Sequence, residues 1–391
     1  MDRITEYNEI AENVVDHYES GTTGQAKAPL NVPVSHYTDA DRWHQEIEKI
    51  FKRVPLMLAM TCEMKEPGTY KAIEMAGVPL LMTRGKDGKA RAFINVCTHR
   101  GAPVVADGHG NASKFSCPYH GWTFANDGHL VGIADRAKFG NVAPEDMGLT
   151  ELPCDERVGF IFVVLTPGLG IDVDKWLGGL IDDLAPYGVA DWYYHGTLEI
   201  DGANWKIAYD GYLEGYHFTA LHPDTIANVS INNLMDFTAY GPHLRTAYGE
   251  TNIEELKDVP KEDWHTRENN GFSFVRTLFP NISMYLGLGL GQIAQIAPGP
   301  TPGENRTYLN FVHPTPPKDD TQKAEFDTTM HFLRDVVRDE DYDLNFKIQR
   351  GLKANPFDHI TFGRNEQGNQ YFHQWVDYYL NDDPNALPPS L

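Results

Sequence analysis

The sequence has few cysteines, a deficit of positive charge and no long hydrophobic run. Its 391 residues include 4 Cys, too few for a disulfide scaffold in a chain of this length. Lys and Arg total 33 against 55 Asp and Glu, and the net charge of −22 disfavours nucleic acid and anionic membranes as partners. No apolar run approaches the roughly 18 residues of a membrane span, and the acidic amino terminus lacks an apolar signal core. These absences predict a cytoplasmic globular protein.

The distribution of polar, strand-like and helical segments divides the chain into three regions. Residues 1–45 are polar and helical in pattern, whereas residues 46–166 contain short β-type segments separated by glycine-rich turns. Residues 167–391 mix strand-like segments with a long helix from about Thr321 to Leu352. We therefore expect an α+β protein. An antiparallel β domain comes first, and the N-terminal helical segment packs on the larger second domain.

The β region contains two cysteine–histidine pairs. Cys97 and His99 form a Cys-x-His pair, and Cys117 and His120 form a Cys-x-x-His pair. Two sulfur and two nitrogen ligands suit tetrahedral Zn²⁺ or an iron–sulfur centre in which two histidines replace two cysteines on one iron. Zinc knuckles usually separate the cysteine pair from the histidine pair, whereas each half here supplies one of each. The pattern favours the cluster over zinc or unrelated loop residues, and His109 is expected to be a solvated loop residue.

A second group of candidate ligands lies in the segment from Asn204 to Asp224. A helix that begins near Lys206 would place Glu214 and His217 on one face. His222 converges on His217 only if that helix bends or breaks near the following proline. Two histidines and a distant carboxylate form the facial triad of non-heme Fe(II) oxygenases. Without the third ligand, the two histidines are better explained as surface or core residues.

A carboxylate in the C-terminal helix is a candidate third ligand. The apolar residues of this helix step by three or four apart from one gap of seven, and Asp341 fills that gap; they are Met330, Leu333, Val337, Leu344, Ile348 and Leu352. An aspartate in an apolar stripe is costly unless it is paired or metal-bound. We expect Asp341 to bind the metal, with a buried salt bridge to an arginine as the alternative. Its neighbours Asp339, Glu340 and Asp343 are expected on a solvated face.

These motifs resemble those of a known family. The segment from Cys97 to Gly101 and the segment from Cys117 to Trp122 are similar to the Rieske [2Fe–2S] domain of ring-hydroxylating Rieske non-heme iron oxygenases. The segments around His217 and Asp341 are similar to the mononuclear iron site of the α subunits of that family. The resemblance extends over residues 40–355. It implies that Cys97 and Cys117 bind one iron of the cluster and His99 and His120 the other, with the mononuclear Fe(II) on His217, His222 and Asp341.

The same resemblance implies a fold and an activity. The second domain would be a helix-grip fold, an antiparallel sheet wrapped on a long helix around an apolar pocket whose walls lie between Ile226 and Ile296. The protein would be a terminal oxygenase for an aromatic or other hydrophobic compound. It would use O₂ and electrons from NAD(P)H, delivered by a separate ferredoxin or flavin reductase, since no dinucleotide-binding glycine motif is present. The alternatives are a monooxygenase or O-demethylase of the family, or an electron-transfer protein without oxygenase activity.

Two further acidic residues receive catalytic roles from the resemblance. Glu214 occupies the position that links a cluster histidine of one subunit to an iron histidine of its neighbour, which implies a head-to-tail homotrimer, with or without a small β subunit. The alternative for Glu214 is a surface position on a helix. Asp210 is expected to support the site or relay protons. Many dioxygenases of the family carry Asp and Asn at these two positions, whereas Glu at the first occurs in monooxygenase-type members.

A basic hairpin is predicted just before Cys97. It carries Arg84, Lys86, Lys89 and Arg91, opposed by a single aspartate. This hairpin is a candidate docking site for the electron donor. The alternative is an exposed strand edge kept soluble by lysines.

Overall fold

The computed structural model describes residues 3–287, 289–354, 357–383 and 385–391, so the first two residues of the expected N-terminal segment lie outside it. The chain forms two compact units. Unit 1 holds Met1–Ile50, Leu177–Asp183 and Tyr193–Leu391, and unit 2 holds Phe51–Trp176 and Leu184–Trp192. The expected boundary after residue 166 falls inside unit 2. Among the described helices, none combines the length and the apolarity needed to cross a bilayer.

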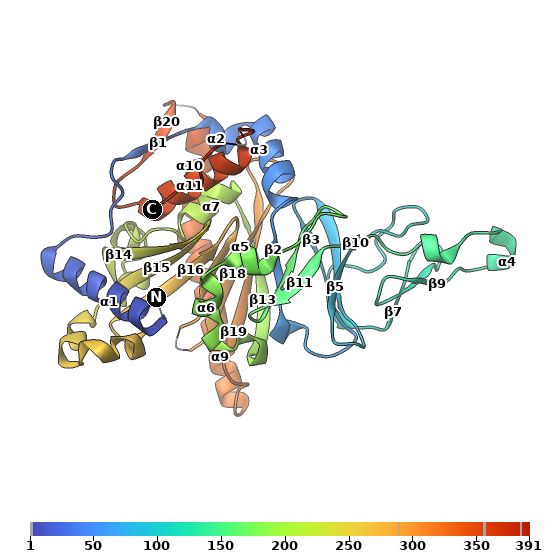
Figure 1. Cartoon of the computed structure of the whole chain (residues 1–391), viewed down its shortest axis with the longest axis horizontal. Coiled ribbons are helices and arrows are strands. Elements are labelled where there is room, and N and C mark those ends of the chain that lie inside the picture. Colours follow the sequence, from blue (N-terminus) through green and yellow to red (C-terminus); the bar gives the residue numbers. More distant parts are fainter. Residues whose placement is uncertain (1–2, 288, 355–356, 384) are drawn as a thin grey trace. The chain divides into compact units, whose positions relative to one another are not determined.

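Unit 2 is built on antiparallel strands, as the glycine-rich turns predict. A five-stranded sheet has the order β10 (Glu151–Leu152), β5 (Ala90–Ile94), β4 (Val78–Arg84), β3 (Thr69–Met75) and β6 (Gly108–Asn111). A three-stranded sheet is formed by β11 (Cys154–Arg157), β12 (Phe160–Val163) and β2 (Leu56–Met60). A second one is formed by β7 (Lys114–Ser116), β8 (Thr123–Ala125) and β9 (Leu130–Gly132). The short helix α4 (Arg136–Phe139) follows β9 (Figure 1).

The core of unit 2 includes both cysteines of the paired motifs. Cys97, Cys117, Trp122 and Phe124 belong to one buried apolar cluster. His109 lies in β6 rather than in a loop, and its ring contacts the buried carboxylate of Glu63. His109 is exposed, as expected, but the prediction of a loop position is wrong, because pairing with β3 places His109 in a strand.

Unit 1 contains a seven-stranded antiparallel sheet. Its order is β13 (Tyr193–Gly202), β19 (Asn305–His313), β18 (Gly291–Pro298), β17 (Ile282–Tyr285), β16 (Phe272–Leu278), β15 (His243–Glu250) and β14 (Ser230–Tyr240). All of its strand pairs are antiparallel, and five of the six are between neighbours in the sequence. This sheet accounts for the strand-like segments expected within residues 167–391. The predicted α+β class is confirmed.

The helices of unit 1 include one long helical run near its C-terminal end. It consists of α9 (Asp320–Val336), a π-helical segment η9 (Val337–Tyr342) and α10 (Asp343–Lys353), close to the predicted helix but interrupted by the π segment. α10 packs against α7 (Trp205–Asp210) and α2 (Ser35–Thr38), and α11 (Gln367–Leu380) lies in the same group of helices (Figure 1).

The N-terminal helix α1 (Arg3–Ser20) packs on β14 and β15 in the same unit. Its buried side chains join an apolar cluster with Leu234 and Phe274, and Tyr7 also donates a hydrogen bond of 2.6 Å to Asp183. Asp183 is buried between Arg245 and Arg276, each 2.8 Å away. Burial alone would raise the pKa of Asp183, but these two guanidinium groups outweigh burial and lower it. The ion cluster therefore stays charged beneath α1.

Candidate metal centres

The two loops that carry the cysteine–histidine pairs adopt the same turn. The Gly101 amide donates to the Cys97 carbonyl at 2.9 Å, and the Gly121 amide donates to the Cys117 carbonyl at 3.0 Å. Both glycines have positive φ, +81° and +68°, a conformation that strains other residues. The turn holds each cysteine inward and places the histidine two or three residues later.

The structure brings the four residues of these loops together. Cys97 and Cys117 are 2% and 3% exposed, and the rings of His99 and His120 lie 4.6 Å apart. Burial, together with the neighbouring Cys117 sulfur, raises the pKa of the Cys97 thiol. The buried His99 Nδ1 has no hydrogen-bond partner among the described residues. Two adjacent buried thiols and an unpaired ring nitrogen are groups that metal binding would satisfy, so this donor set fits a [2Fe–2S] cluster.

Aromatic side chains pack around the cluster histidines. The His99 ring stacks on Trp122 at 4.9 Å with an interplanar angle of 9°. Phe139 of α4 meets both rings edge-on, with centroids 5.4 Å from each. Trp122 directly follows the second ligand pair, but Phe139 was not found from the sequence because no local pattern places α4 beside His99.

In unit 1 the structure brings His217, His222 and Asp341 together. One potential ligand atom of each lies within 4.8 Å of the others. Asp341 Oδ1 is 3.1 Å from His222 Nε2 and 3.8 Å from His217 Nε2. Two imidazole nitrogens and one carboxylate facing a common point fit a mononuclear Fe(II) site with open coordination positions.

The local backbone explains how the two histidines converge. The expected helix from Lys206 past His217 is wrong: α7 ends at Asp210, and a turn follows before α8 (Phe218–Leu221). His217 and His222 flank α8 as its N-cap and C-cap residues. Because each ligand sits at a helix end rather than on one face, the five-residue spacing brings the rings to 5.1 Å.

Asp341 lies in the π-helical segment, where the extra residue per turn shifts the buried face of the helix. Leu344 and Ile348 are 38% and 40% exposed, while Asn345 and Gln349 are buried. The expectation of one continuous apolar stripe is therefore wrong beyond Tyr342. The alternative role for Asp341 was a buried salt bridge with an arginine. Among the described residues, its ion-pair contacts are instead with the two histidines.

A second carboxylate stands behind each of these histidines. Glu214 contacts His217 Nδ1, and Glu340 contacts His222 Nδ1. Thr225 Oγ1 also donates to Glu340 at 2.9 Å. Carboxylates in this position fix the ring orientation and leave Nε2 for a metal. Burial by itself lowers the pKa of His222, but contacts with Asp341 and Glu340 outweigh it and raise the pKa.

Glu340 was expected on a solvated face, and this expectation is wrong. The side chain is about three-quarters buried, between His222 and Thr225. In the π-helical turn, the consecutive residues Glu340 and Asp341 both contact the His222 ring, one at each nitrogen. A regular helix would direct them 100° apart, so only knowledge of the π segment could have predicted the pairing.

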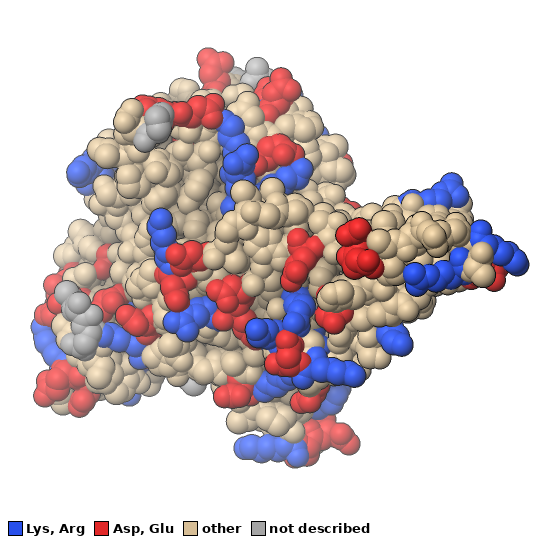
Figure 2. Space-filling model, turned by 45° about the vertical axis from the view of Figure 1, so that its right-hand side comes forward, with Lys and Arg blue, Asp and Glu red and all other residues tan. Residues whose placement is uncertain are grey.

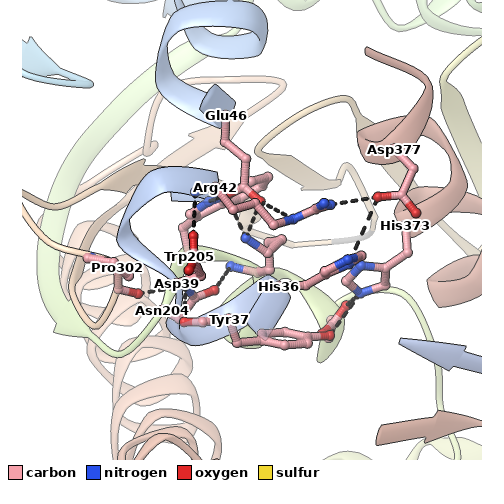
Figure 3. Close-up of polar contacts among 12 residues, drawn as sticks. His36, Tyr37, Asp39, Arg42, Glu46, Asn204, Trp205, Pro302, His373 and Asp377 are labelled. Atoms are coloured by element: carbon pink, nitrogen blue, oxygen red, sulfur yellow. Dashed lines mark hydrogen bonds and ion pairs between the residues drawn. The ribbon is translucent and has the colours of Figure 1, made fainter. Parts of the chain in front are cut away.

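Asp210 does not contact these ligands directly. Its carboxylate accepts hydrogen bonds from Tyr37 at 2.8 Å and from His373 Nε2 at 2.9 Å. Figure 3 shows Tyr37 and His373 pointing toward one another, beside the 2.6 Å ion pair of Arg42 with Asp377. Asp210 thus ties the end of α7 to α2 and α11. A role in proton relay stays a prediction.

A cavity of about 920 Å³ adjoins the three candidate ligands. Aromatic rings form part of its wall, and Phe218 lies 5.6 Å from Tyr248 beside the histidines. A Cβ on Gly215 would lie 2.8 Å from the Phe218 ring and 3.1 Å from the Tyr248 ring, so the close packing requires glycine there. The expected walls of Phe, Leu and Ile are only partly present. Polar side chains share the lining, among them Asn228, Ser230, Glu250, Asn252, Ser273 and Gln292.

Comparison with known proteins identifies the family. The family model "Ring hydroxylating alpha subunit (catalytic domain)" matches residues 189–382, and "Rieske [2Fe-2S] domain" matches residues 54–145. The carnitine monooxygenase oxygenase subunit of Escherichia coli (strain K12) is 26% identical over 90% of this chain and 94% of its own. The chloroplastic choline monooxygenase of Spinacia oleracea is 27% identical over 89% of this chain and 78% of its own.

Solved structures show the same fold. The quaternary ammonium Rieske monooxygenase CntA with L-carnitine superposes with a TM-score of 0.76 at 22% identity, covering 96% of this chain and 99% of that one. Naphthalene 1,2-dioxygenase from Rhodococcus sp. bound to indole gives 0.73 at 20% identity, with the same coverage. Since the two scores are so close, the fold does not distinguish the substrate class.

The chain is the α subunit of a Rieske non-heme iron oxygenase, and it carries the Rieske [2Fe–2S] cluster and the mononuclear iron typical of that family. As a terminal oxygenase it depends on a reductase partner. The two sequence relatives described above are monooxygenases of carnitine and choline rather than hydroxylases of aromatic compounds. They support the monooxygenase alternative of the sequence analysis better than its first expectation of an aromatic or other hydrophobic substrate.

Proposed function

We propose that this protein monooxygenates a quaternary ammonium compound. The observation that carries the proposal is the make-up of the cavity beside His217, His222 and Asp341. The face of an aromatic ring attracts a quaternary ammonium cation, and Phe218 and Tyr248 supply a ring pair next to the two histidines. Half-buried carboxylates in the same lining add a favourable electrostatic field. The names of the relatives agree with this choice of substrate.

We assign the metal ligands as follows. The cluster is held by Cys97, His99, Cys117 and His120, and the mononuclear iron by His217, His222 and Asp341. When bound, the mononuclear iron supplies the site of O₂ activation. Glu214 and Glu340 hold the Nδ1 protons of the iron histidines and so keep both rings in the orientation that binds metal.

The overall reaction balances with two electrons and two protons per turnover. One oxygen atom of O₂ replaces a substrate C–H bond with C–OH, and the other leaves as water. The electrons originate from NAD(P)H and arrive through the reductase, directly or by way of a ferredoxin. We propose further that the protein works as a homotrimer, in which Glu214 bridges a cluster histidine of a neighbouring subunit to His217, so that electrons pass from that cluster to the mononuclear iron.

A single-turnover experiment tests the proposed function. The iron-loaded protein, chemically reduced without its reductase, is exposed to ¹⁸O₂ with carnitine, choline, glycine betaine or naphthalene. We expect an ¹⁸O-labelled product from at least one of the three ammonium compounds, detected by mass spectrometry with aldehydes trapped by rapid reduction. Label incorporated only into naphthalene would contradict the proposal.

A further inference from the structure

The cavity beside the candidate iron ligands is acidic. Its acidic residues are Glu214, Asp224, Glu250 and Asp341, and its lining in the described part of the chain includes no lysine or arginine. Glu214 and Asp341 contact the histidines, which leaves two carboxylates without a positive partner in the lining. Away from the iron, a substrate carboxylate in this cavity would lose its water shell without gaining a counter-ion, and it would meet like charges.

Glu250 is the acid best placed to interact with a bound substrate. It is the last residue of β15 and is half-buried in the cavity wall. The Gly271 amide donates to Glu250 Oε2 at 3.1 Å, which fixes the carboxylate. Burial raises the pKa of Glu250, as expected for a carboxyl group that has no cation beside it. A bound ammonium group would favour its charged form.

An aromatic ring accompanies Glu250. Tyr285 lines the same cavity, and burial raises the pKa of Tyr285 to about 12, with a further contribution from the nearby charge of Glu250. A carboxylate and an aromatic face both attract a cation, whereas the carboxylate repels an anion. The neutral amides of Asn228, Asn252 and Gln292 in the lining can bond to a hydroxyl or carbonyl group of a substrate.

We infer that the substrate is a quaternary ammonium cation with an uncharged tail, such as an alcohol, and that Glu250 selects against ammonium compounds that also carry a carboxylate. This inference rests on the proposed function and narrows it. Two effects favour an ammonium compound with an uncharged tail over one with a carboxylate. The acidic lining attracts a substrate of net positive charge, and a carboxylate would be placed where the described lining has no lysine or arginine.

Choline and glycine betaine form a matched pair of probes. Both have a trimethylammonium head on a short chain, and they differ in carrying a hydroxymethyl group or a carboxylate. Titration calorimetry with iron-loaded, unreduced protein measures binding without turnover, and tetramethylammonium reports on the head alone. We expect choline to bind at least about tenfold more tightly than glycine betaine, a difference of about 1.4 kcal/mol.

The outcomes separate this inference from the proposed function. Equal or tighter binding of glycine betaine, with choline or tetramethylammonium also bound, overturns the neutral-tail inference and leaves the proposed function standing. If none of the three compounds binds, the neutral-tail inference falls, and the proposed function falls with it if carnitine does not bind either.

Glu250→Gln tests the residue itself. We expect this variant to bind choline about tenfold more weakly and glycine betaine more tightly, so that the preference is lost. Glu250→Asp keeps the charge and should keep most of the preference. Glu262→Gln, at an exposed position of η8 (Lys261–Arg267) outside the cavity lining, is the matched control and should change neither affinity. An unchanged preference in folded Glu250→Gln protein overturns the role of Glu250.

Discussion

The histidines of the two candidate metal centres differ in what lies behind them. In unit 1, each iron histidine has a carboxylate at Nδ1, Glu214 for His217 and Glu340 for His222. In unit 2, the His99 ring stacks on Trp122, and its buried Nδ1, unpaired among the described residues, is left as a candidate ligand atom. The two histidines of unit 1 are oriented by charge, whereas His99 is oriented by aromatic packing.

This difference follows from what each centre has to do. Carboxylates behind imidazoles raise ligand basicity and help to hold a divalent ion that has only three protein ligands. The cluster iron assigned to His99 and His120 would also be bound by the sulfides of the cluster, so these histidines need less support. Buried Trp122 and half-exposed Phe139 pack against the His99 ring, and solvent access and hydrogen bonding set the potential of an iron–sulfur centre.

The largest effect is expected when a ligand of the mononuclear iron is removed, because this should affect one metal centre and spare the other. We expect His222→Ala and Asp341→Ala to lower turnover by at least about 1000-fold, because two remaining ligands cannot keep the iron in a catalytic geometry. Iron analysis should fall from three atoms per chain to two, while the visible spectrum of the cluster survives. Conversely, Cys117→Ser should abolish that spectrum and spare binding of the mononuclear iron. Full activity in either alanine variant would remove that residue from the site.

Glu214→Gln should separate metal binding from electron delivery. The amide keeps the size of the side chain but removes the charge beside His217 Nδ1. We expect a folded, iron-replete protein whose cluster reduces normally and whose electron transfer to the mononuclear iron is slowed about 100-fold. Rapid-mixing absorbance of the reduced cluster with O₂ and substrate measures this rate. Near-normal rates would assign Glu214 a merely structural position, and a fully active monomer would exclude transfer between subunits.

The contrast between the two centres also shows what a sequence can reveal. The four candidate cluster residues lie in two short loops whose glycines enforce one turn, so local spacing was enough to group them. His217 and His222 were paired from their spacing, although through a helix that does not form. Asp341 was singled out because a charge in an apolar helix needs a partner, even though the stripe shifts after the π segment.

The residues that the sequence did not reveal share one property. Glu340, Glu250 and Phe139 act through neighbours that are far away in the chain: His222 is 118 residues from Glu340 and Phe139 is in a different element from His99. Periodicity reports on one element at a time and cannot detect such pairs. The make-up of the cavity was missed for the same reason, since its lining includes residues of α8, five strands and the α9–η9 helix.

Glu340→Gln removes the charge of one of the two carboxylates that contact the iron histidines, and so tests what that charge contributes to iron binding. His222 would lose the charge that orients it, and we expect iron affinity to fall by roughly tenfold, measured by competition with a chelator. Asp339→Asn is the matched control, because Asp339 lies one residue away, is exposed and pairs only with Arg338 among its ion pairs. Equal iron loss in the two variants would indicate a general effect of charge on this helix rather than support of His222.

The smallest effect is expected at the surface near the cluster, where electrons enter. The basic hairpin proposed from the sequence is only partly available, because Arg84 is buried against Glu156 and Arg91 pairs with Asp87. Figure 2 shows Lys and Arg side chains gathered at the end of unit 2 that carries α4, and Arg136 and Lys138 are exposed there.

The surface that carries Arg136 and Lys138 lies beside the candidate cluster residues, since the Phe139 ring of α4 packs edge-on against the His99 ring. We therefore expect charge reversal at Arg136 and Lys138 to slow reduction by an acidic donor about fivefold at low salt, with little effect at high salt, because such steering is screened. The same reversal at Lys86 and Lys89 serves as the comparison. Stopped-flow reduction of the cluster across a salt series distinguishes the two surfaces. A larger effect of reversal at Lys86 and Lys89 would place donor docking at the hairpin. If neither reversal has an effect, the donor recognises the α4 end of unit 2 through apolar contacts, such as the exposed face of Phe139.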